Sequence, residues 1–251
     1  MDYILKENER IDDLEFNNLK IIQNKDGFCF GIDSILLSDF AKDIKKNSKV
    51  LDLGTGSGII ATLLCEKTEL KEIIGVEIQE EVAHMAQRSI ILNKLENKFK
   101  VLNCDIKDLN EKIENNSIDA IVTNPPYKKL NTGKINENQK KLISRHEISA
   151  NLDDFIKISK KLLKNNGSMY IVHKTERLED ILVKLRDNKL EPKLIRFIYS
   201  KINEDSKLVL IKAVKNAKPF LKVEKPLIIY NFNGKYTDEI LEIYNKNRNE
   251  E

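Results

Sequence analysis

The stretch Asp52-Leu53-Gly54-Thr55-Gly56-Ser57-Gly58 decides the fold, because it turns out of an apolar run, Lys49 to Leu53, that is typical of a buried strand. Its alternating glycines permit positive φ angles and let backbone amides approach a ligand closely. A helix predicted from Ile59 to about Lys67 adds partial positive charge at its N-terminus. A second apolar strand, Glu72 to Glu77, ends on a carboxylate that suits both hydroxyls of a ribose. This order predicts the nucleotide-binding half of a doubly wound α/β sheet.

The glycine spacing narrows the choice of ligand class. The three glycines follow the pattern G-x-G-x-G, whereas the dinucleotide fingerprint is G-x-G-x-x-G. This departure argues against a pyrophosphate, and so against a nicotinamide dehydrogenase. It favours a smaller adenosine ligand.

Polar groups follow two further predicted strands. A helix is expected from Glu80 to Leu95, and the strand after it, Phe99 to Asn103, leads into Cys104-Asp105-Ile106. Asp105 suits an adenine amino group while Ile106 packs on the ring, although Asp105 is nearly as good a helix N-cap. The fourth strand, Ile118 to Thr123, is followed directly by Asn124. Ligands bind at the carboxyl edge of open α/β sheets, so we expect one site built from Asp52, Glu77, Asp105 and Asn124.

The segment Asn124-Pro125-Pro126-Tyr127 forms a stiff corner after the fourth strand. Two prolines fix two φ angles, remove two backbone donors and keep the preceding residues out of the helical region. Asn supplies an amide, and Tyr supplies a flat ring with a polar tip. Oriented carbonyl oxygens beside an aromatic ring are suited to bind a planar amide or amino group. The alternative is a turn that merely ends the strand, since Asn-Pro is a common turn opener.

The remaining periodicity completes an α/β chain, for which we expect one domain over residues 1–251. Within it, 1–45 is an N-terminal strand and helix, 46–215 the core sheet and 216–251 a C-terminal appendage. Asp33 or Ser34 is expected to cap the first helix, and Phe28 and Phe30 either pack in the core or line the pocket. The other expected strands are Leu19–Asn24, Gly167–His173, Glu191–Tyr199, Lys207–Val214 and 227–230, and the other helices are Leu152–Leu163, Thr175–Asn188 and Thr237–Tyr244.

The composition is that of a globular protein. Of 251 residues, 41% are hydrophobic and 33% charged, and the net charge of +3 alone implies no nucleic-acid partner. The start of the chain lacks a signal pattern, and no apolar run approaches the roughly 18 residues that a membrane span needs. Cys29, Cys65 and Cys104 show no metal spacing, so we interpret them as buried thiols of a reduced cytoplasmic protein and expect no metal and no membrane contact.

A basic cluster follows Tyr127 in a long segment without strong periodicity. Between Tyr127 and Ala150, six basic residues face two acidic ones, Glu137 and Glu147; the basic residues are Lys128, Lys129, Lys134, Lys140, Lys141 and Arg145. Such a cluster suits phosphates, and the alternative is a solvated charged loop in a lysine-rich protein.

With these motifs in place, the chain resembles class I S-adenosylmethionine-dependent methyltransferases. The stretch from Asp52 to Gly58 resembles their first motif, and Asn124-Pro125-Pro126-Tyr127 resembles the catalytic motif of members that methylate exocyclic amino or amide nitrogens. From about residue 12 to 245, the chain resembles the bacterial tRNA (adenine-N6) methyltransferases that modify valine tRNA next to the anticodon. That likeness rests on Gly27-Phe28-Cys29-Phe30-Gly31-Ile32-Asp33, Gly75-Val76-Glu77-Ile78-Gln79, Arg145-His146-Glu147, Leu190-Glu191-Pro192-Lys193 and Pro226-Leu227.

The resemblance implies a Rossmann-like, seven-stranded, mostly parallel sheet with an antiparallel closing strand. It implies S-adenosylmethionine as cofactor, tRNA as substrate, and a monomer or weak homodimer. The implied catalytic residues are Asn124, Pro125, Pro126 and Tyr127, and the implied RNA-binding residues are Lys128, Lys129, Lys140, Lys141 and Arg145. The implied cofactor-binding residues are Phe28, Phe30, Asp33, Asp52, Gly54, Thr55, Gly56, Gly58, Glu77, Ile78, Asp105, Ile106 and Asn124.

Other functions share parts of this pattern. Protein-(glutamine-N5) methyltransferases of release factors carry the same Asn-Pro-Pro-Tyr motif, but usually with an N-terminal helical domain and an acidic pair where this chain has Lys128-Lys129. Another RNA or DNA amino group is a further possible target. An RNA-binding scaffold without activity is disfavoured by the intact Asp52, Glu77 and Asn124.

Overall fold

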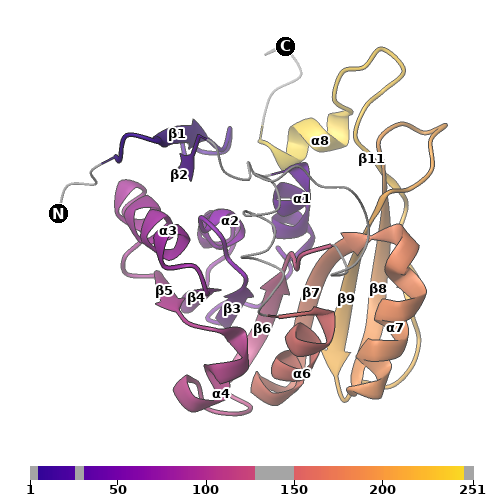
Figure 1. Ribbon diagram of the computed structural model, residues 1–251. Coiled ribbons are helices and arrows are strands. Elements are labelled where there is room, and N and C mark those ends of the chain that lie inside the picture. The colour runs from indigo at the N-terminus through magenta and orange to yellow at the C-terminus, as the bar shows by residue number, and fades with distance from the viewer. Residues whose placement is uncertain (1–4, 26–30, 128–149, 246–251) are drawn as a thin grey trace, which may run out of the picture.

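A single large sheet forms the centre of the computed structural model, which describes residues 5–25, 31–127 and 150–245 (Figure 1). Its strand order is β5-β4-β3-β6-β7-β9-β8, and β9 alone among these runs antiparallel to its neighbours. In that order the strands are Phe99–Asn103, Glu72–Glu77, Lys49–Leu53, Ile118–Thr123, Leu163–Lys174, Leu208–Lys215 and Leu190–Tyr199.

The seven expected strands are therefore present, but the sheet does not stop at seven. Two strands of two residues each, β10 (Lys222–Val223) and β11 (Leu227–Ile228), pair in parallel with β8 and bring the sheet to nine strands. The antiparallel strand β9 lies between β7 and β8 rather than at the sheet edge.

Helices cover both faces of the sheet (Figure 1). Because side chains alternate across a strand, Val50 packs with one core cluster and Leu51 with the other. The first cluster includes residues of α1 (Ile32–Phe40), α2 (Ile59–Lys67) and α3 (Glu80–Leu92). The second includes residues of α4 (Leu109–Lys112), α6 (Leu152–Leu162) and α7 (Leu178–Asp187). Both faces of the central strands are consequently buried, as a parallel sheet requires.

A hairpin outside the large sheet precedes α1. Its strands β1 (Glu9–Asp13) and β2 (Lys20–Asn24) pair antiparallel, and β1 was not expected from the sequence. Arg88 of α3 holds the hairpin by donating from both terminal nitrogens to the Glu9 carboxylate at 2.5 and 2.6 Å. The backbone N–H of Ile22 donates to the hydroxyl of Ser89, also on α3, at 2.9 Å.

Three local expectations were wrong. α1 begins at Ile32 with Gly31 as its N-cap, so neither Asp33 nor Ser34 caps it, because both already have helical positions in its first turn. β7 begins at Leu163, since the backbone after α6 is extended and pairs with β6 at once. Cys104 is only half-buried, whereas Cys65 is buried as expected, and Cys29 lies outside the described residues.

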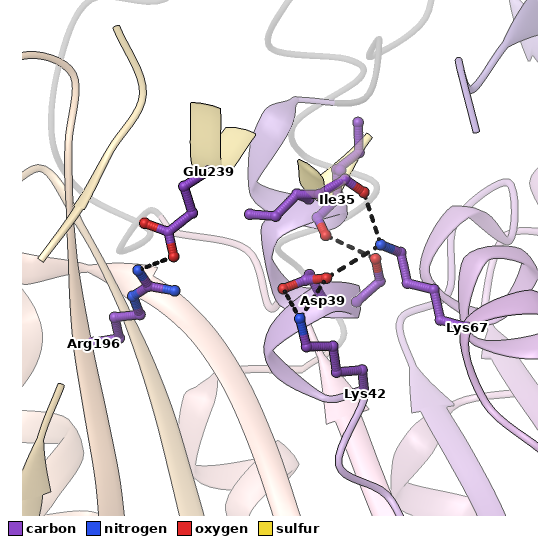
Figure 2. Close-up of polar contacts among 8 residues, drawn as sticks. Ile35, Asp39, Lys42, Lys67, Arg196 and Glu239 are labelled. Carbon is purple, nitrogen blue, oxygen red and sulfur yellow. Dashed lines mark hydrogen bonds and ion pairs between the residues drawn. The ribbon is translucent and has the colours of Figure 1, made fainter. Parts of the chain in front are cut away.

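The C-terminal helix α8 (Asp238–Ile243) packs against α1. Ile240 and Ile243 lie in the same core cluster as α1 and α2. Figure 2 shows two polar anchors of this region: Arg196 of β8 donates to Glu239 at 2.5 Å, and Lys67 reaches from α2 to Asp39 of α1. Across the described ranges, none of the helices has both the length and the apolar character needed to span a membrane.

Candidate active site

The carboxyl ends of β3, β4, β5 and β6 meet at one edge of the sheet. These strands are parallel neighbours, and Leu53 of β3 lies in register with Val76 of β4 and Thr123 of β6. The polar residues that follow the four strands therefore lie along one edge of the sheet.

The glycine turn after β3 keeps space open above the sheet. Gly56 has a φ of 57°, and a Cβ placed on it would meet no atom within 4 Å. Gly58 has a φ of 91° and precedes α2, and a Cβ there would lie 3.0 Å from the ring of Phe99. Gly56 thus leaves room for a ligand, whereas Gly58 lets the turn pack against β5.

Asp52 lies buried beneath this turn. Its Oδ2 accepts a hydrogen bond of 2.7 Å from the hydroxyl of Thr55. The backbone N–H of Ala61 lies near the carboxylate and favours its ionised form, although within the described residues Oδ1 has no partner in ordinary hydrogen-bond geometry. Burial raises the pKa of Asp52 to about 7, and the nearby Glu77 charge acts in the same direction. The ionised form of the Asp52 carboxylate would stabilise a cationic ligand group beside it.

Glu77 closes the other side of the turn. Its side chain is 3% exposed, and its two oxygens accept from the backbone N–H groups of Gly56 at 3.1 Å and Gln79 at 2.9 Å. These bonds fix the carboxylate at the end of β4, where the sequence placed a ribose acceptor. Ile78 beside it is 38% exposed and offers an apolar surface.

Asp105 makes the helix-cap contact that the sequence offered as an alternative to a ligand contact. Its Oδ1 accepts from the backbone N–H of Lys107 at 3.0 Å and caps the short helix η1 (Ile106–Asp108). Ile106 is buried in the core cluster that includes residues of α4 and α6.

Asp33 connects the first helix to the motif after β6. Its Oδ2 accepts from the side-chain nitrogen of Asn124 at 3.0 Å and from the hydroxyl of Tyr127 at 2.8 Å. Because the Asn124 nitrogen faces Asp33, its amide oxygen faces the opposite way, and this oxygen has no hydrogen bond among the described residues. A carboxylate that was expected to touch the cofactor thus orients the amide of the motif.

Tyr127 and His173 form the aromatic part of the site. Their ring centroids lie 5.1 Å apart with the planes tilted by 60°. Burial and the Asp33 charge raise the pKa of the Tyr127 hydroxyl well above its ordinary value, so this group stays protonated. His173 is 1% exposed and its Nδ1 accepts from the backbone N–H of Lys174 at 2.8 Å, and burial lowers its pKa to about 4. His173 is consequently neutral and carries its proton on Nε2.

Several expected site residues lie outside the described ranges. They are Phe28, Phe30, Lys128, Lys129, Lys140, Lys141 and Arg145. Among the residues that are described, no group of His, Cys, Asp and Glu side chains could hold a metal ion. The sequence analysis missed Gln23, whose side-chain nitrogen reaches the hydroxyl of Ser57 in the glycine turn at 3.3 Å. No local signal marks it, since the two residues are 34 positions apart.

Known proteins share this architecture. A solved predicted O-methyltransferase from Agrobacterium tumefaciens matches with a TM-score of 0.69 and 18% identity, covering 84% of this chain and 95% of that one. The M. jannaschii TYW2 structure in complex with AdoMet matches with a TM-score of 0.57 and 16% identity, covering 84% and 87%. These likenesses confirm the expected class I methyltransferase fold.

Relatives are also found by sequence. A Haemophilus influenzae protein named tRNA1(Val) (adenine(37)-N6)-methyltransferase is 26% identical over 234 residues, covering 91% of this chain and 94% of its own length. A protein of the same name from Parabacteroides distasonis is 27% identical over 178 residues, covering 71% and 73%. The family model described as methyltransferase small domain matches residues 16–188. The chain therefore belongs to the methyltransferase small domain family.

Proposed function

We propose that this protein transfers a methyl group from S-adenosylmethionine to the exocyclic N6 amino group of an adenine in tRNA, next to the anticodon of valine tRNA. The names of the curated relatives from Haemophilus influenzae and Parabacteroides distasonis support this substrate. The reaction would take place in the cytoplasm, where tRNA is found.

The orientation of the Asn124 amide carries the proposal. An adenine amino nitrogen is a poor nucleophile because its lone pair is delocalised into the ring. Two acceptors aimed at its N–H bonds favour a pyramidal nitrogen, and such preorganised dipoles stabilise charge that develops during transfer. Asp33 holds the Asn124 nitrogen at 3.0 Å, which leaves the amide oxygen as one acceptor. The carbonyl of Pro125, fixed by the proline corner, would be the second.

The residues at the sheet edge fit the cofactor, which supplies an activated methyl group on a sulfonium. Gly56 leaves open space and Asp52 offers a buried oxygen without a partner. We assign the ribose hydroxyls to Glu77 and the adenine ring to the apolar surface of Ile78. Gly54, Thr55 and Gly58 shape the turn around the methionine part.

We assign the target base to Tyr127 and the tRNA phosphates to the basic segment. Stacking of a base on an aromatic ring is worth about 1–3 kcal/mol, which offsets much of the cost of unstacking a loop nucleotide. Lys128, Lys129, Lys140, Lys141 and Arg145 supply positive charge near this ring in the sequence.

The direct test measures transfer of a labelled methyl group to RNA. The purified protein is incubated with radiolabelled S-adenosylmethionine and unmodified tRNA, and the digested RNA is searched for labelled N6-methyladenosine. Label confined to valine tRNA supports the proposal. Cofactor binding without RNA label contradicts it and directs the next assay to release-factor glutamine.

A variant tests the proposed role of the amide. Asn124→Ala should lower the methylation rate by about 10²–10³-fold, the effect of removing one preorganised transition-state contact, while cofactor affinity changes little. Asn110→Ala, on the exposed surface of α4, is the matched control. A wild-type rate in Asn124→Ala would contradict this mechanism.

A further inference from the structure

Gln23 reaches the glycine turn from outside the large sheet. It lies near the end of β2, which is fixed on α3 by the hydrogen bond from Ile22 to Ser89. Its side chain is 4% exposed, and its Nε2 donates to the hydroxyl of Ser57 at 3.3 Å. The hairpin and the turn therefore share a buried polar contact.

The oxygen of the same carboxamide has no partner. In the described part of the chain, only three buried side-chain atoms lack a hydrogen bond: Gln23 Oε1, Asp52 Oδ1 and Thr62 Oγ1. Gln23 and Asp52 both adjoin the glycine turn, through Ser57 and Thr55. The backbone N–H of Ala61 lies near the Asp52 carboxylate, so the clearer case is Gln23. Buried polar atoms nearly always have partners, so the unpartnered Gln23 oxygen at this turn indicates a donor that a ligand brings.

The chemistry of the proposed cofactor identifies that donor. Glu77 is assigned to the ribose hydroxyls, and a sulfonium has no N–H or O–H to donate. The adenine amino group is also a donor, but the ribose separates it from the methionine part, which we place at the glycine turn. The donor left for Gln23 is therefore the ammonium of the amino-acid head. Resting on the proposed function, we propose that Gln23 binds the amino-acid head of S-adenosylmethionine, with its carboxamide oxygen accepting a hydrogen bond from the ammonium.

The proposed role of Gln23 can be distinguished from a purely structural role by ligand binding. A carboxamide that only joined β2 to the glycine turn would affect every ligand of the pocket equally. A group that binds the amino-acid head affects only ligands that have one. S-adenosylhomocysteine has this head and 5′-methylthioadenosine lacks it, although both keep the nucleoside.

The experiment is calorimetric titration of both ligands into wild type, Gln23→Ala and Gln23→Glu. Gln23→Ala should weaken S-adenosylhomocysteine binding by about tenfold or more, as expected for losing a hydrogen bond to a charged group, and 5′-methylthioadenosine binding by less than about twofold. Gln23→Glu keeps an acceptor and should retain S-adenosylhomocysteine affinity within about threefold of wild type. Gln87→Ala, on the exposed face of α3, is the matched control and should bind both ligands as wild type does.

Each other outcome is decisive. Equal losses for both ligands, or no loss for either, overturn the assignment of Gln23. If Gln23→Ala does not fold, Gln23→Glu still decides: S-adenosylhomocysteine affinity within about threefold of wild type supports the assignment, and an equal loss for both ligands in this variant overturns it. Wild type that binds neither ligand overturns the proposed function as well. Wild type that binds both but labels no tRNA contradicts only the substrate.

Discussion

At the scale of single residues, Asp52 is a carboxyl group that the fold keeps away from water beneath the glycine turn. Burial raises its pKa to about 7, whereas a cationic ligand nearby favours the ionised form and lowers the pKa. Below pH 7 the free protein therefore holds a proton on Asp52 that must leave when a cation binds.

We predict that affinity for S-adenosylmethionine falls as the pH drops from 7.5 to 5.5, by at most about tenfold per pH unit. Calorimetry in two buffers of different ionisation enthalpy would detect the released proton. Asp52→Asn cannot titrate and should show a flatter profile. A wild-type profile as flat as that of the variant would contradict the raised pKa.

His173 makes a second pH-sensitive contribution, to the stability of the fold. Burial lowers its pKa to about 4, while the imidazole of an unfolded chain titrates near 6.5. Between these values the unfolded chain binds a proton that the folded chain does not. The free energy of unfolding should therefore be fully retained above pH 6.5 and fall by about 3 kcal/mol as the pH drops towards 4.

Urea unfolding at pH 7 and pH 4.5 measures this loss. His173→Asn should lose less stability between the two pH values than wild type, because its side chain does not titrate. His84→Asn, on the exposed side of α3, should behave as wild type does. Equal pH dependence in all three proteins would show that His173 is protonated in the fold.

At the scale of elements, Lys67 joins three helices. Its ammonium pairs with Asp39 of α1 at 3.3 Å (Figure 2). It also donates to the carbonyl of Ile243 of α8 at 2.9 Å and lies 4.3 Å from the ring centroid of Phe16. Its side chain is only 7% exposed, and burial lowers its pKa. Lys42, the other cation at Asp39, is 62% exposed and therefore weakly bound.

We predict that Lys67→Ala lowers the free energy of unfolding by at least about 2 kcal/mol, because breaking a buried ion pair usually costs about 3–5 kcal/mol and Lys42 still faces Asp39. Lys42→Ala should cost no more than about 1 kcal/mol. Chemical denaturation of both variants checks the difference. Equal effects would mean that burial does not distinguish the two ion pairs.

At the scale of the whole molecule, the C-terminal segment shares its core with the N-terminal helices. Ile240 of α8 is fully buried, in the same cluster as Leu36 of α1 and Leu64 of α2. The rings of Tyr236 and Tyr244 stack with centroids 5.7 Å apart, which holds the C-terminal end of α8 beside that cluster. Loss of this packing should therefore weaken the sheet as well as α8.

We predict that Ile240→Ala lowers the free energy of unfolding by about 2–5 kcal/mol, the usual cost of such a truncation in a core. Circular dichroism and tyrosine fluorescence should report the same shifted transition, and the chain has no Trp to complicate the fluorescence. Ile202→Ala, at a side chain 50% exposed, should change stability by no more than about 0.5 kcal/mol. A shift seen by one probe alone would show that α8 unfolds separately.

The sequence by itself determined most of the helices and strands and the residue types along the sheet edge. The strands Glu72–Glu77, Phe99–Asn103 and Ile118–Thr123 and the helix Ile59–Lys67 have the predicted bounds. Their apolar periodicity, the glycine turn and the proline corner are properties of neighbouring residues, so they can be recognised without a partner. The likeness of the two motifs to methyltransferases rested on the same local patterns.

Only the tertiary structure decided which side chains meet. Asp33 orients Asn124 across 91 positions, Gln23 reaches Ser57 across 34, and Arg88 binds Glu9 across 79. The sequence left Asp105 open between a cap and a ligand acceptor, and it placed the cap of α1 wrongly. Such contacts depend on how crossover connections bring distant elements to one edge of the sheet. That placement is set by packing of the whole core, and no local pattern encodes it.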